Sequence, residues 1–226
     1  MRRIYLKISC VIFIVICISA CGWFKSGYIG LSSPEALYQR GYEYYHKGKY
    51  DQAIEVFQRV TEEYPLSKLA LMAELGVADS YFSDEHYDEA EMSYSDFMNF
   101  HPTNENLPYV MYQIGMCHYN QMSSIDRDQS QAVMARESFT QLMTRFPSSK
   151  FAFMGEKKLR ESKKRLGEHE FYVGQFYFKR EQYNAALQRF TIVAREYENL
   201  GMDYKVSYYI EETKRRLSGE QAEEKE

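Results

Sequence analysis

Cysteine is scarce in this chain of 226 residues, which has only four. Three of them lie in the first 21 residues, and Cys117 is the fourth. Cys10 and Cys17 fall inside a predicted signal peptide, and Cys21 is predicted below to carry lipid. No intramolecular disulfide is therefore expected in the mature chain. Cys117 lies in an apolar helical pattern, where we expect a small buried hydrophobic side chain rather than a reactive thiol.

Motifs of catalysis and of metal binding are also missing. The five histidines show no H-E-x-x-H or other metal-ligand spacing. The sequence has no G-x-S-x-G, no P-loop and no dinucleotide fingerprint. His169, which precedes Glu170, is predicted to have a structural role at the start of a helix. We therefore predict no catalytic residues, no metal site, no cofactor and no enzymatic activity; a periplasmic hydrolase or metal protein is the contrasting hypothesis.

A basic charge balance is absent as well. The net charge is −4, so the sequence predicts no nucleic-acid partner. An apolar content of 45% and a charged content of 27% are typical of a folded protein. Aromatic residues are abundant instead, with 21 tyrosines and 14 phenylalanines. Tyrosine combines an apolar ring with a polar tip, which suits helix pairs that expose an aromatic groove.

The N-terminus has a short basic segment and then an apolar run over residues 8–20. This run is too short to span a bilayer but suits the apolar region of a signal peptide. It ends in Ile18-Ser19-Ala20-Cys21, which resembles the lipobox of bacterial lipoproteins. We predict a signal peptide over residues 1–20, and a lipidated Cys21 with a tether over residues 21–33. An ordinary signal peptide followed by a chance cysteine is the alternative.

Residues 37–65, LYQRGYEYYHKGKYDQAIEVFQRVTEEYP, form the unit that the rest of the chain repeats. The helical period of its apolar residues predicts two helices, one over residues 34–46 and one that stops at Pro65, separated by residues 47–49. Small residues twelve apart let the two helices cross closely. The unit has the tetratricopeptide order of small residue, tyrosine, alanine, phenylalanine and proline: Gly41, Tyr44, Ala53, Phe57 and Pro65.

Three later units repeat this order. The second has Ala78, Tyr81, Ala90, Tyr94 and Pro102. The third has Gly115, Ala135, Phe139 and Pro147, with a predicted polar loop over residues 122–130. The fourth has Gly174, Tyr177, Ala186 and Phe190, after a helical stretch over residues 151–165 and then Gly167.

A final helix over about residues 204–217 would cover the last open face of such a stack. The charged residues 218–226 are predicted to be a disordered tail. The fold class is therefore predicted as all-α: a right-handed solenoid over residues 34–217, with about four tetratricopeptide-like helix pairs and a C-terminal capping helix.

The first helix of each unit carries a stripe of mostly aromatic residues. Tyr38, Tyr42 and Tyr45 share one helix face, because they are spaced i, i+4 and i+7. A concave groove formed by three units would include Tyr38, Tyr42, Tyr45, Leu75, Phe82, Tyr109, Tyr112, Met116 and Tyr119. Such a groove suits an extended or helical peptide with aromatic side chains. The alternative is that this stripe belongs to the core.

Several stretches together resemble the BamD family of outer-membrane assembly lipoproteins. They are the cysteine of the lipobox, GYEYYHKGKYDQAIEVFQRVTEEYP, FHPTNENLPYVMYQIGMCHYNQM and PSSKFAFMGEKKLRESKKRLGEHEFYVGQFYFKREQYNAALQRF. The last is the most specific, because H-E-x-x-V-G-x-F-Y-F-K-R is not a general feature of helical repeats. The resemblance extends to about Leu217, and the chain departs from the family after Glu198.

The resemblance implies a non-enzymatic scaffold on the periplasmic face of the outer membrane, and Gly22 after the cysteine favours that membrane. Implied partners are the β-barrel insertase BamA, other assembly lipoproteins and unfolded outer-membrane protein precursors, whose last strand ends in an aromatic residue. By motif position, Arg189 would contact the insertase, with Lys179 and Arg180; a solvated helix end is the alternative. A scaffold for another envelope machine, such as a pilus or secretion apparatus, is the alternative function.

Overall fold

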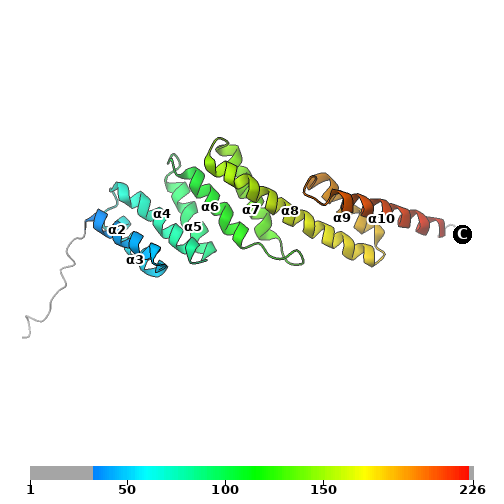
Figure 1. Ribbon diagram of the computed structural model, residues 1–226, viewed down its shortest axis with the longest axis horizontal. Helices are drawn as coiled ribbons and strands as arrows, with labels where there is room; N and C mark the ends of the chain where they lie inside the picture. Colours follow the sequence, from blue (N-terminus) through cyan, green and yellow to red (C-terminus); the bar gives the residue numbers. More distant parts are fainter. Residues whose placement is uncertain (1–32, 224–226) are drawn as a thin grey trace, which may run out of the picture.

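The structure of the protein is a computed structural model that describes residues 33–223. The predicted signal peptide, Cys21 and nearly all of the predicted tether lie outside the described residues. Between these limits the chain forms helices joined by short connections (Figure 1). In chain order the helices are α2 (Pro34–His46), α3 (Tyr50–Glu63), α4 (Lys68–Ser83), α5 (Tyr87–Phe100), α6 (Leu107–Asn120), α7 (Ser130–Arg145), α8 (Lys150–Lys179), α9 (Tyr183–Glu196) and α10 (Asp203–Glu223).

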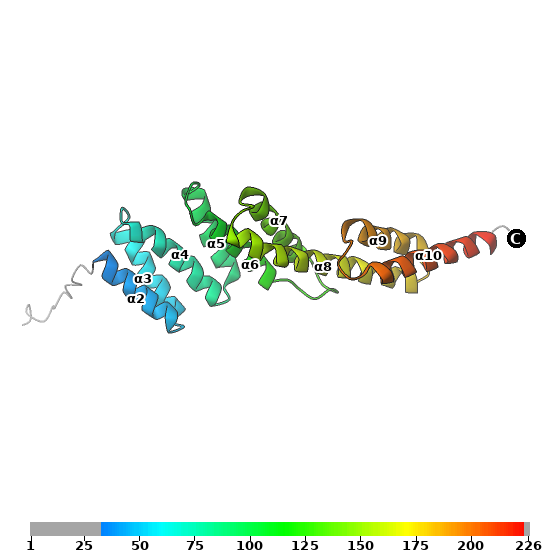
Figure 2. The same cartoon turned by 45° about the horizontal axis from the view of Figure 1, so that its top comes forward.

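Each helix packs against the next one in the chain, so the helices form an elongated solenoid with α2 and α10 at opposite ends (Figures 1 and 2). The first helices of neighbouring units also touch, α2 against α4 and α6 against α8. The predicted all-α solenoid of helix pairs with a C-terminal cap is therefore confirmed. None of the helices within residues 33–223 is long and apolar enough to cross a membrane.

Local signals fix the first unit as predicted. Ser33 accepts a hydrogen bond from the backbone N–H of Ala36 and caps α2, whose first residue is Pro34. Gly48 has a φ of +68°, a backbone conformation that glycine adopts at no steric cost, and it turns the chain between α2 and α3. The predicted bounds of the first helix and its break at residues 47–49 are confirmed.

The small residues of the repeat make room for a phenylalanine ring. A Cβ atom at Gly41 would lie 2.7 Å from the ring of Phe57, and one at Gly115 would lie 2.6 Å from the ring of Phe139. Both rings are at most 2% exposed. The alanines twelve or twenty positions later are completely buried: Ala53, Ala90, Ala135 and Ala186. Each fully buried ring of this kind contributes about 1.5–3 kcal/mol of transfer free energy.

Helix α8 departs from the prediction. The sequence suggested a helical stretch, an interruption near Gly167 and a new start beyond it, but α8 is one helix of 30 residues. Gly167 is buried inside it, and a Cβ atom there would lie 2.9 Å from the Cβ of Tyr197 and 2.7 Å from the Cε of Met202. The glycine therefore permits a close approach of the α9–α10 connection and does not end a helix.

The connection between α6 and α7 is an ordered loop over residues 121–129, as predicted. Two side chains of α8 hold it. Arg165 donates to the carbonyl of Ser123, and His169 Nδ1 donates to the carbonyl of Ile125 at 2.7 Å. His169 therefore has a structural role, but it lies inside α8, so its predicted place at a helix start is wrong.

The capping helix α10 is longer than predicted. Its apolar residue Val206 packs with Val193, Leu200 and Met202, so the last open face is covered as expected. The helix continues to Glu223, and the prediction of a disordered tail is wrong for residues 218–223. Glu212 pairs with Arg215 and Arg216 one turn later, and such pairs stabilise an exposed helix.

Candidate functional site

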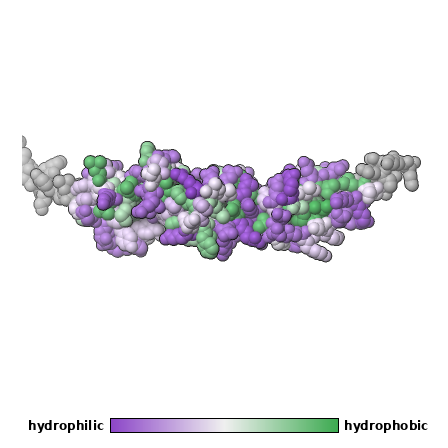
Figure 3. Space-filling model, turned by 90° about the horizontal axis from the view of Figure 1, so that it is seen from above, coloured by the Kyte–Doolittle hydropathy of each residue, from purple (hydrophilic) through white to green (hydrophobic). Residues whose placement is uncertain are grey.

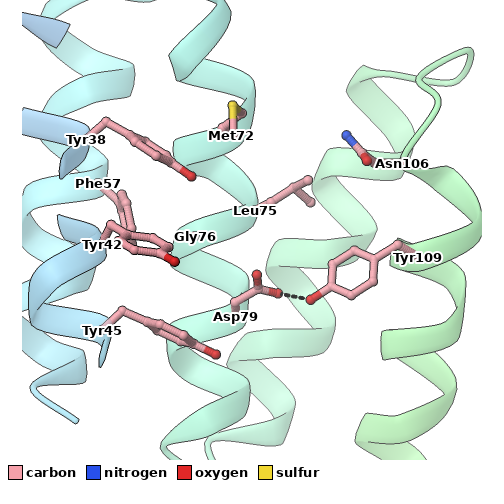
Figure 4. A pocket seen from close by; sticks show the side chains of 10 residues that line it. All are labelled: Tyr38, Tyr42, Tyr45, Phe57, Met72, Leu75, Gly76, Asp79, Asn106 and Tyr109. Carbon is pink, nitrogen blue, oxygen red and sulfur yellow. Dashed lines mark hydrogen bonds between the residues drawn. The ribbon is translucent and has the colours of Figure 1, made fainter. Parts of the chain in front are cut away.

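A pocket opens between α2, α4 and the start of α6 (Figure 4). Its volume is about 260 Å³. This is slightly below the range of roughly 300–1,000 Å³ for small-molecule sites, so the pocket suits one large side chain and its backbone. We call it the tyrosine pocket; it is lined by Tyr38, Tyr42, Tyr45, Phe57, Met72, Leu75, Gly76, Asp79, Asn106 and Tyr109.

Three tyrosines on one face of α2 form the first wall, as their spacing predicted (Figure 4). The ring of Tyr38 lies 5.5 Å from that of Phe57, and the hydroxyl of Tyr45 is 2.9 Å from the hydroxyl of Ser83 on α4. Tyr42 has no such anchor in the core; it is 46% exposed and packs edge-on against His46. Tyr42 is therefore the side chain of this wall most available to a ligand.

Phe57 forms the floor between the two walls. Its ring contacts Gly41 on α2 and Gly76 on α4, and a Cβ atom at either glycine would lie 2.7 Å from it. The opposite wall of α4 presents Met72, which is 48% exposed, and Leu75, which is 9% exposed. An aromatic ring that entered the pocket would contact tyrosine rings on one side and aliphatic side chains on the other.

Asp79 is the polar centre of the pocket. Its Oδ1 accepts hydrogen bonds from the hydroxyls of Tyr94 and Tyr109, each at 2.5 Å. The amide of Gln113 lies behind both hydroxyls, at 3.3 Å from that of Tyr94 and 3.2 Å from that of Tyr109. Burial raises the pKa of Asp79, and the two hydroxyl donors oppose this shift. The pKa values of both tyrosines are raised by burial and by the nearby carboxylate.

The predicted groove residues separate into two groups. The five that line the tyrosine pocket are Tyr38, Tyr42, Tyr45, Leu75 and Tyr109. The four that do not line it are Phe82, Tyr112, Met116 and Tyr119. The predicted single stripe is thus divided, because neighbouring helices cover its second part.

Contacts explain why those four residues lie elsewhere. Phe82 packs against Tyr87 at 5.5 Å within the second unit. Tyr112 lies 5.9 Å from the ring of Phe151 on α8, and Met116 packs with the same buried cluster. The hydroxyl of Tyr119 donates to Glu161 at 2.7 Å, and the Lys158 ammonium lies 3.8 Å from its ring centre. These side chains join the third unit to α8.

The three basic residues predicted at the insertase contact lie at the α8–α9 end of the solenoid. Arg189 is ion-paired with Glu170 at 2.8 Å across the two helices. The guanidinium of Arg180 stacks on the ring of Phe176 at 4.5 Å, and Lys179 is the last residue of α8. Arg189 therefore has a structural partner, which an isolated sequence motif does not reveal.

Five residues that line the pocket are absent from the groove residues named from the sequence: Phe57, Met72, Gly76, Asp79 and Asn106. Met72 lies one helical turn before Leu75 on the face that also carries Asp79, so the helical period contained the signal. Asn106 precedes α6 in a connection, where no periodic pattern marks it. Among residues 33–223, no group of three or more histidine, cysteine, aspartate or glutamate side chains could hold a metal ion.

Comparisons with known proteins agree on one family. The model of a family described as an outer membrane lipoprotein, YfiO, matches residues 32–226. The outer membrane protein assembly factor BamD of Rickettsia prowazekii is 30% identical over 177 residues, which cover 78% of this chain and 70% of the relative. BamD of Neisseria gonorrhoeae is 27% identical over 191 residues, covering 80% and 69%, and BamD of Caulobacter vibrioides is 24% identical over 164, covering 73% and 54%.

Proposed function

The chain belongs to the YfiO family of outer membrane lipoproteins, and from this we propose that it is a non-enzymatic scaffold for the assembly of outer-membrane proteins. Its relatives are named outer membrane protein assembly factor BamD, which supports this role. A solenoid of stacked helix pairs offers long binding surfaces, which suits a scaffold. The tetratricopeptide units therefore serve to hold other proteins.

We further propose that the protein is anchored to the periplasmic face of the outer membrane. The support is the lipobox ending in Cys21 and the description of its family as outer membrane lipoproteins. Several acyl chains on one cysteine hold a protein stably at a membrane, whereas a single chain binds only reversibly. Residues 21–33 would then connect the lipid to α2.

The tyrosine pocket is the observation that carries the functional proposal. It is preformed, lined mainly by aromatic and aliphatic side chains, and large enough for one aromatic side chain. In β-barrel membrane proteins, apolar residues alternate with polar ones along the strands and aromatic residues form girdles at both interfaces, so an unfolded precursor exposes many aromatic side chains. We propose that the pocket receives an aromatic side chain of such a precursor.

At the opposite end of the solenoid, we propose that the α8–α9 unit contacts the β-barrel insertase BamA. Lys179 and Arg180 are exposed at the end of α8, and Arg189 lies on α9, the next helix of the same unit. Arg189 is already paired with Glu170. It would therefore hold α9 against α8 in the orientation that BamA binds, and would also present a positive charge to BamA. The two ends of the scaffold would thus bind different partners.

Copurification from isolated outer membranes tests this function. The lipidated protein, tagged after Glu226, should recover a large β-barrel protein with periplasmic domains together with unfolded precursors. A Cys21→Ala variant serves as the control and should lose the membrane fraction. Recovery of pilus or secretion components instead of a β-barrel insertase would contradict the proposal.

A further inference from the structure

The two long edges of the solenoid differ in character. Because successive helices run in opposite directions, every second connection lies at the same edge (Figures 1 and 2). The upper edge in both views has the connections over residues 64–67, 101–106, 146–149 and 197–202. The opposite edge has those over residues 47–49, 84–86, 121–129 and 180–182. We call the upper edge the tether edge, because α2 begins there at Pro34, directly after the predicted tether.

The most exposed large hydrophobic side chains all lie at the tether edge. Each of its four connections has one of them, either within it or no more than four residues away. They are Leu66, which is 100% exposed, Phe100 at 76%, Phe153 at 79% and Tyr204 at 87%. Near the connections of the opposite edge, within residues 33–223, no large hydrophobic side chain is more than half exposed.

The fold does not account for these four side chains. A single exposed hydrophobic residue is ordinary, but one at every connection of a single edge is a pattern. None of the four belongs to the buried clusters that join the described helices. Figure 3, which views the molecule from above Figure 1, looks onto this edge and shows hydrophobic patches along its length among hydrophilic ones. The pattern therefore indicates a contact outside the chain.

The chemistry of the edge suits a lipid surface. Its exposed charges have both signs: Lys68, Lys150 and Lys205 against Glu63, Glu105 and Asp203. Mixed charges give little net attraction, so binding would depend on the apolar side chains. Leucine and aromatic side chains enter the boundary between headgroups and acyl chains, and tyrosine keeps its hydroxyl at headgroup level. Nearby lysines can extend their ammonium groups back into water.

The proposed anchor brings this edge to the membrane first. Cys21 and Pro34 are 13 positions apart, a stretch of chain that spans at most about 45 Å. The opposite edge is one helix length farther from the anchor, about 20–24 Å. A protein held so close to a surface meets it at high effective concentration, so contacts too weak to recruit a free protein can form.

From these observations we propose that the tether edge rests on the phospholipid surface, with Leu66, Phe100, Phe153 and Tyr204 inserted at the interface. The proposal rests on the proposed lipid anchor and adds the orientation of the solenoid, which lies along the membrane with its opposite edge toward the periplasm. The starts of α2 and α6, which border the tyrosine pocket, belong to the tether edge. A client in that pocket is therefore held close to the bilayer.

Fluorescent labels on the lipidated, full-length protein test this orientation. Phe100→Cys and Phe153→Cys each receive a dye, and the buried Cys117 stays unlabelled. Met92→Cys is the matched control, because Met92 is 65% exposed on the same helix as Phe100. The protein is bound to neutral phosphatidylcholine vesicles whose nitroxide-labelled lipids quench the dye at short range. Quenching should be at least about threefold stronger at positions 100 and 153, which lie roughly 12 Å or more nearer the edge.

A second variant tests whether the other apolar side chains take part. Leu66→Ser combined with Tyr204→Ser, in the Phe153→Cys protein, removes two of the inserted groups. Quenching at position 153 should then fall by about half, because binding scales with the apolar area inserted. Both replaced side chains are almost fully exposed, so the fold should be unchanged, which far-ultraviolet circular dichroism checks.

The outcomes separate this proposal from the function on which it rests. Stronger quenching at positions 100 and 153, reduced by the two serines, supports it. Equal quenching at all three positions, while the protein still sediments with the vesicles, overturns it and leaves the anchor in place. If lipids do not quench the edge labels but isolated outer membranes shield them from a water-soluble quencher, the edge binds a protein instead. Failure to sediment with vesicles overturns the proposed anchoring as well.

Discussion

Replacing Phe139 with alanine is expected to lower the free energy of unfolding by about 3–5 kcal/mol, which is among the largest effects of a single truncation in a core. The ring is completely buried. It lies where Cβ atoms at Gly115 and Gly155 would be 2.6 Å and 3.3 Å away, and 5.9 Å from the ring of Tyr112. Loss of the ring therefore leaves a cavity where α6, α7 and α8 meet.

The same contact predicts that the effect of a second substitution, Gly115→Ala, on stability depends on whether Phe139 is present. Gly115→Ala alone forces its new Cβ into the ring of Phe139, and such overpacking costs about 1–3 kcal/mol. In the Phe139→Ala background that obstacle is gone. Alanine then replaces glycine inside a helix, which favours folding by up to about 1 kcal/mol. Gly115→Ala should therefore lower the free energy of unfolding of the unaltered protein, and should leave that of the Phe139→Ala variant unchanged or higher.

Urea unfolding of the four proteins in this cycle measures the coupling directly. Phe153→Ala is a suitable control, because Phe153 is 79% exposed on α8 and its truncation should change stability by less than about 0.5 kcal/mol. If Gly115→Ala destabilised both backgrounds equally, its cost would not come from a clash with the Phe139 ring, and the explanation given for this glycine would be wrong.

The second large effect concerns binding. Truncation of Tyr38 and Tyr42 together removes two of the three rings on the α2 wall, and such central aromatic residues often carry 2 kcal/mol or more of binding free energy. We therefore expect the affinity for a neutral, amidated phenylalanine peptide to fall by at least about tenfold. Anisotropy titration with that peptide measures the loss.

Controls must separate binding from stability. Tyr38 packs on Phe57, so its truncation also weakens the fold, whereas Tyr42 is 46% exposed and its truncation should not. Tyr42→Ala alone is therefore expected to weaken binding without a change in unfolding. Tyr172→Ala is the matched control, because Tyr172 is 43% exposed on α8 and lies outside the pocket. Equal binding by Tyr42→Ala and the unaltered protein would contradict the role of this wall.

Local pattern was sufficient to predict most of the fold. The twelve-residue spacing of Gly41 and Ala53 returns at Ala78 and Ala90, and the structure buries these alanines completely. This spacing recurs because the two helices of each pair cross closely and need small residues at the crossing point. Helix α8 was predicted less well, since Gly167 has the local signature of a helix end while its reason is a contact with Tyr197, some 30 positions later.

The site was predictable in part for the same reason. Helical period placed Tyr38, Tyr42 and Tyr45 on one face, and all three line the pocket. The helical period could not predict that α8 covers Tyr112 and Tyr119, because this depends on how the long helix α8 crosses the third unit. Hydropathy also does not single out the pocket: one face of the molecule shows several separate hydrophobic patches among hydrophilic ones (Figure 3).

Photo-crosslinking in intact cells tests the central claim most directly. A photoreactive amino acid at position 42, on the exposed edge of the tyrosine pocket, is compared with one at Met92, which is 65% exposed on α5 and does not line the pocket. We predict that position 42 captures unfolded outer-membrane protein precursors and that position 92 does not. Absence of precursors at position 42, or equal capture at both positions, would contradict the assignment of this pocket as the client site.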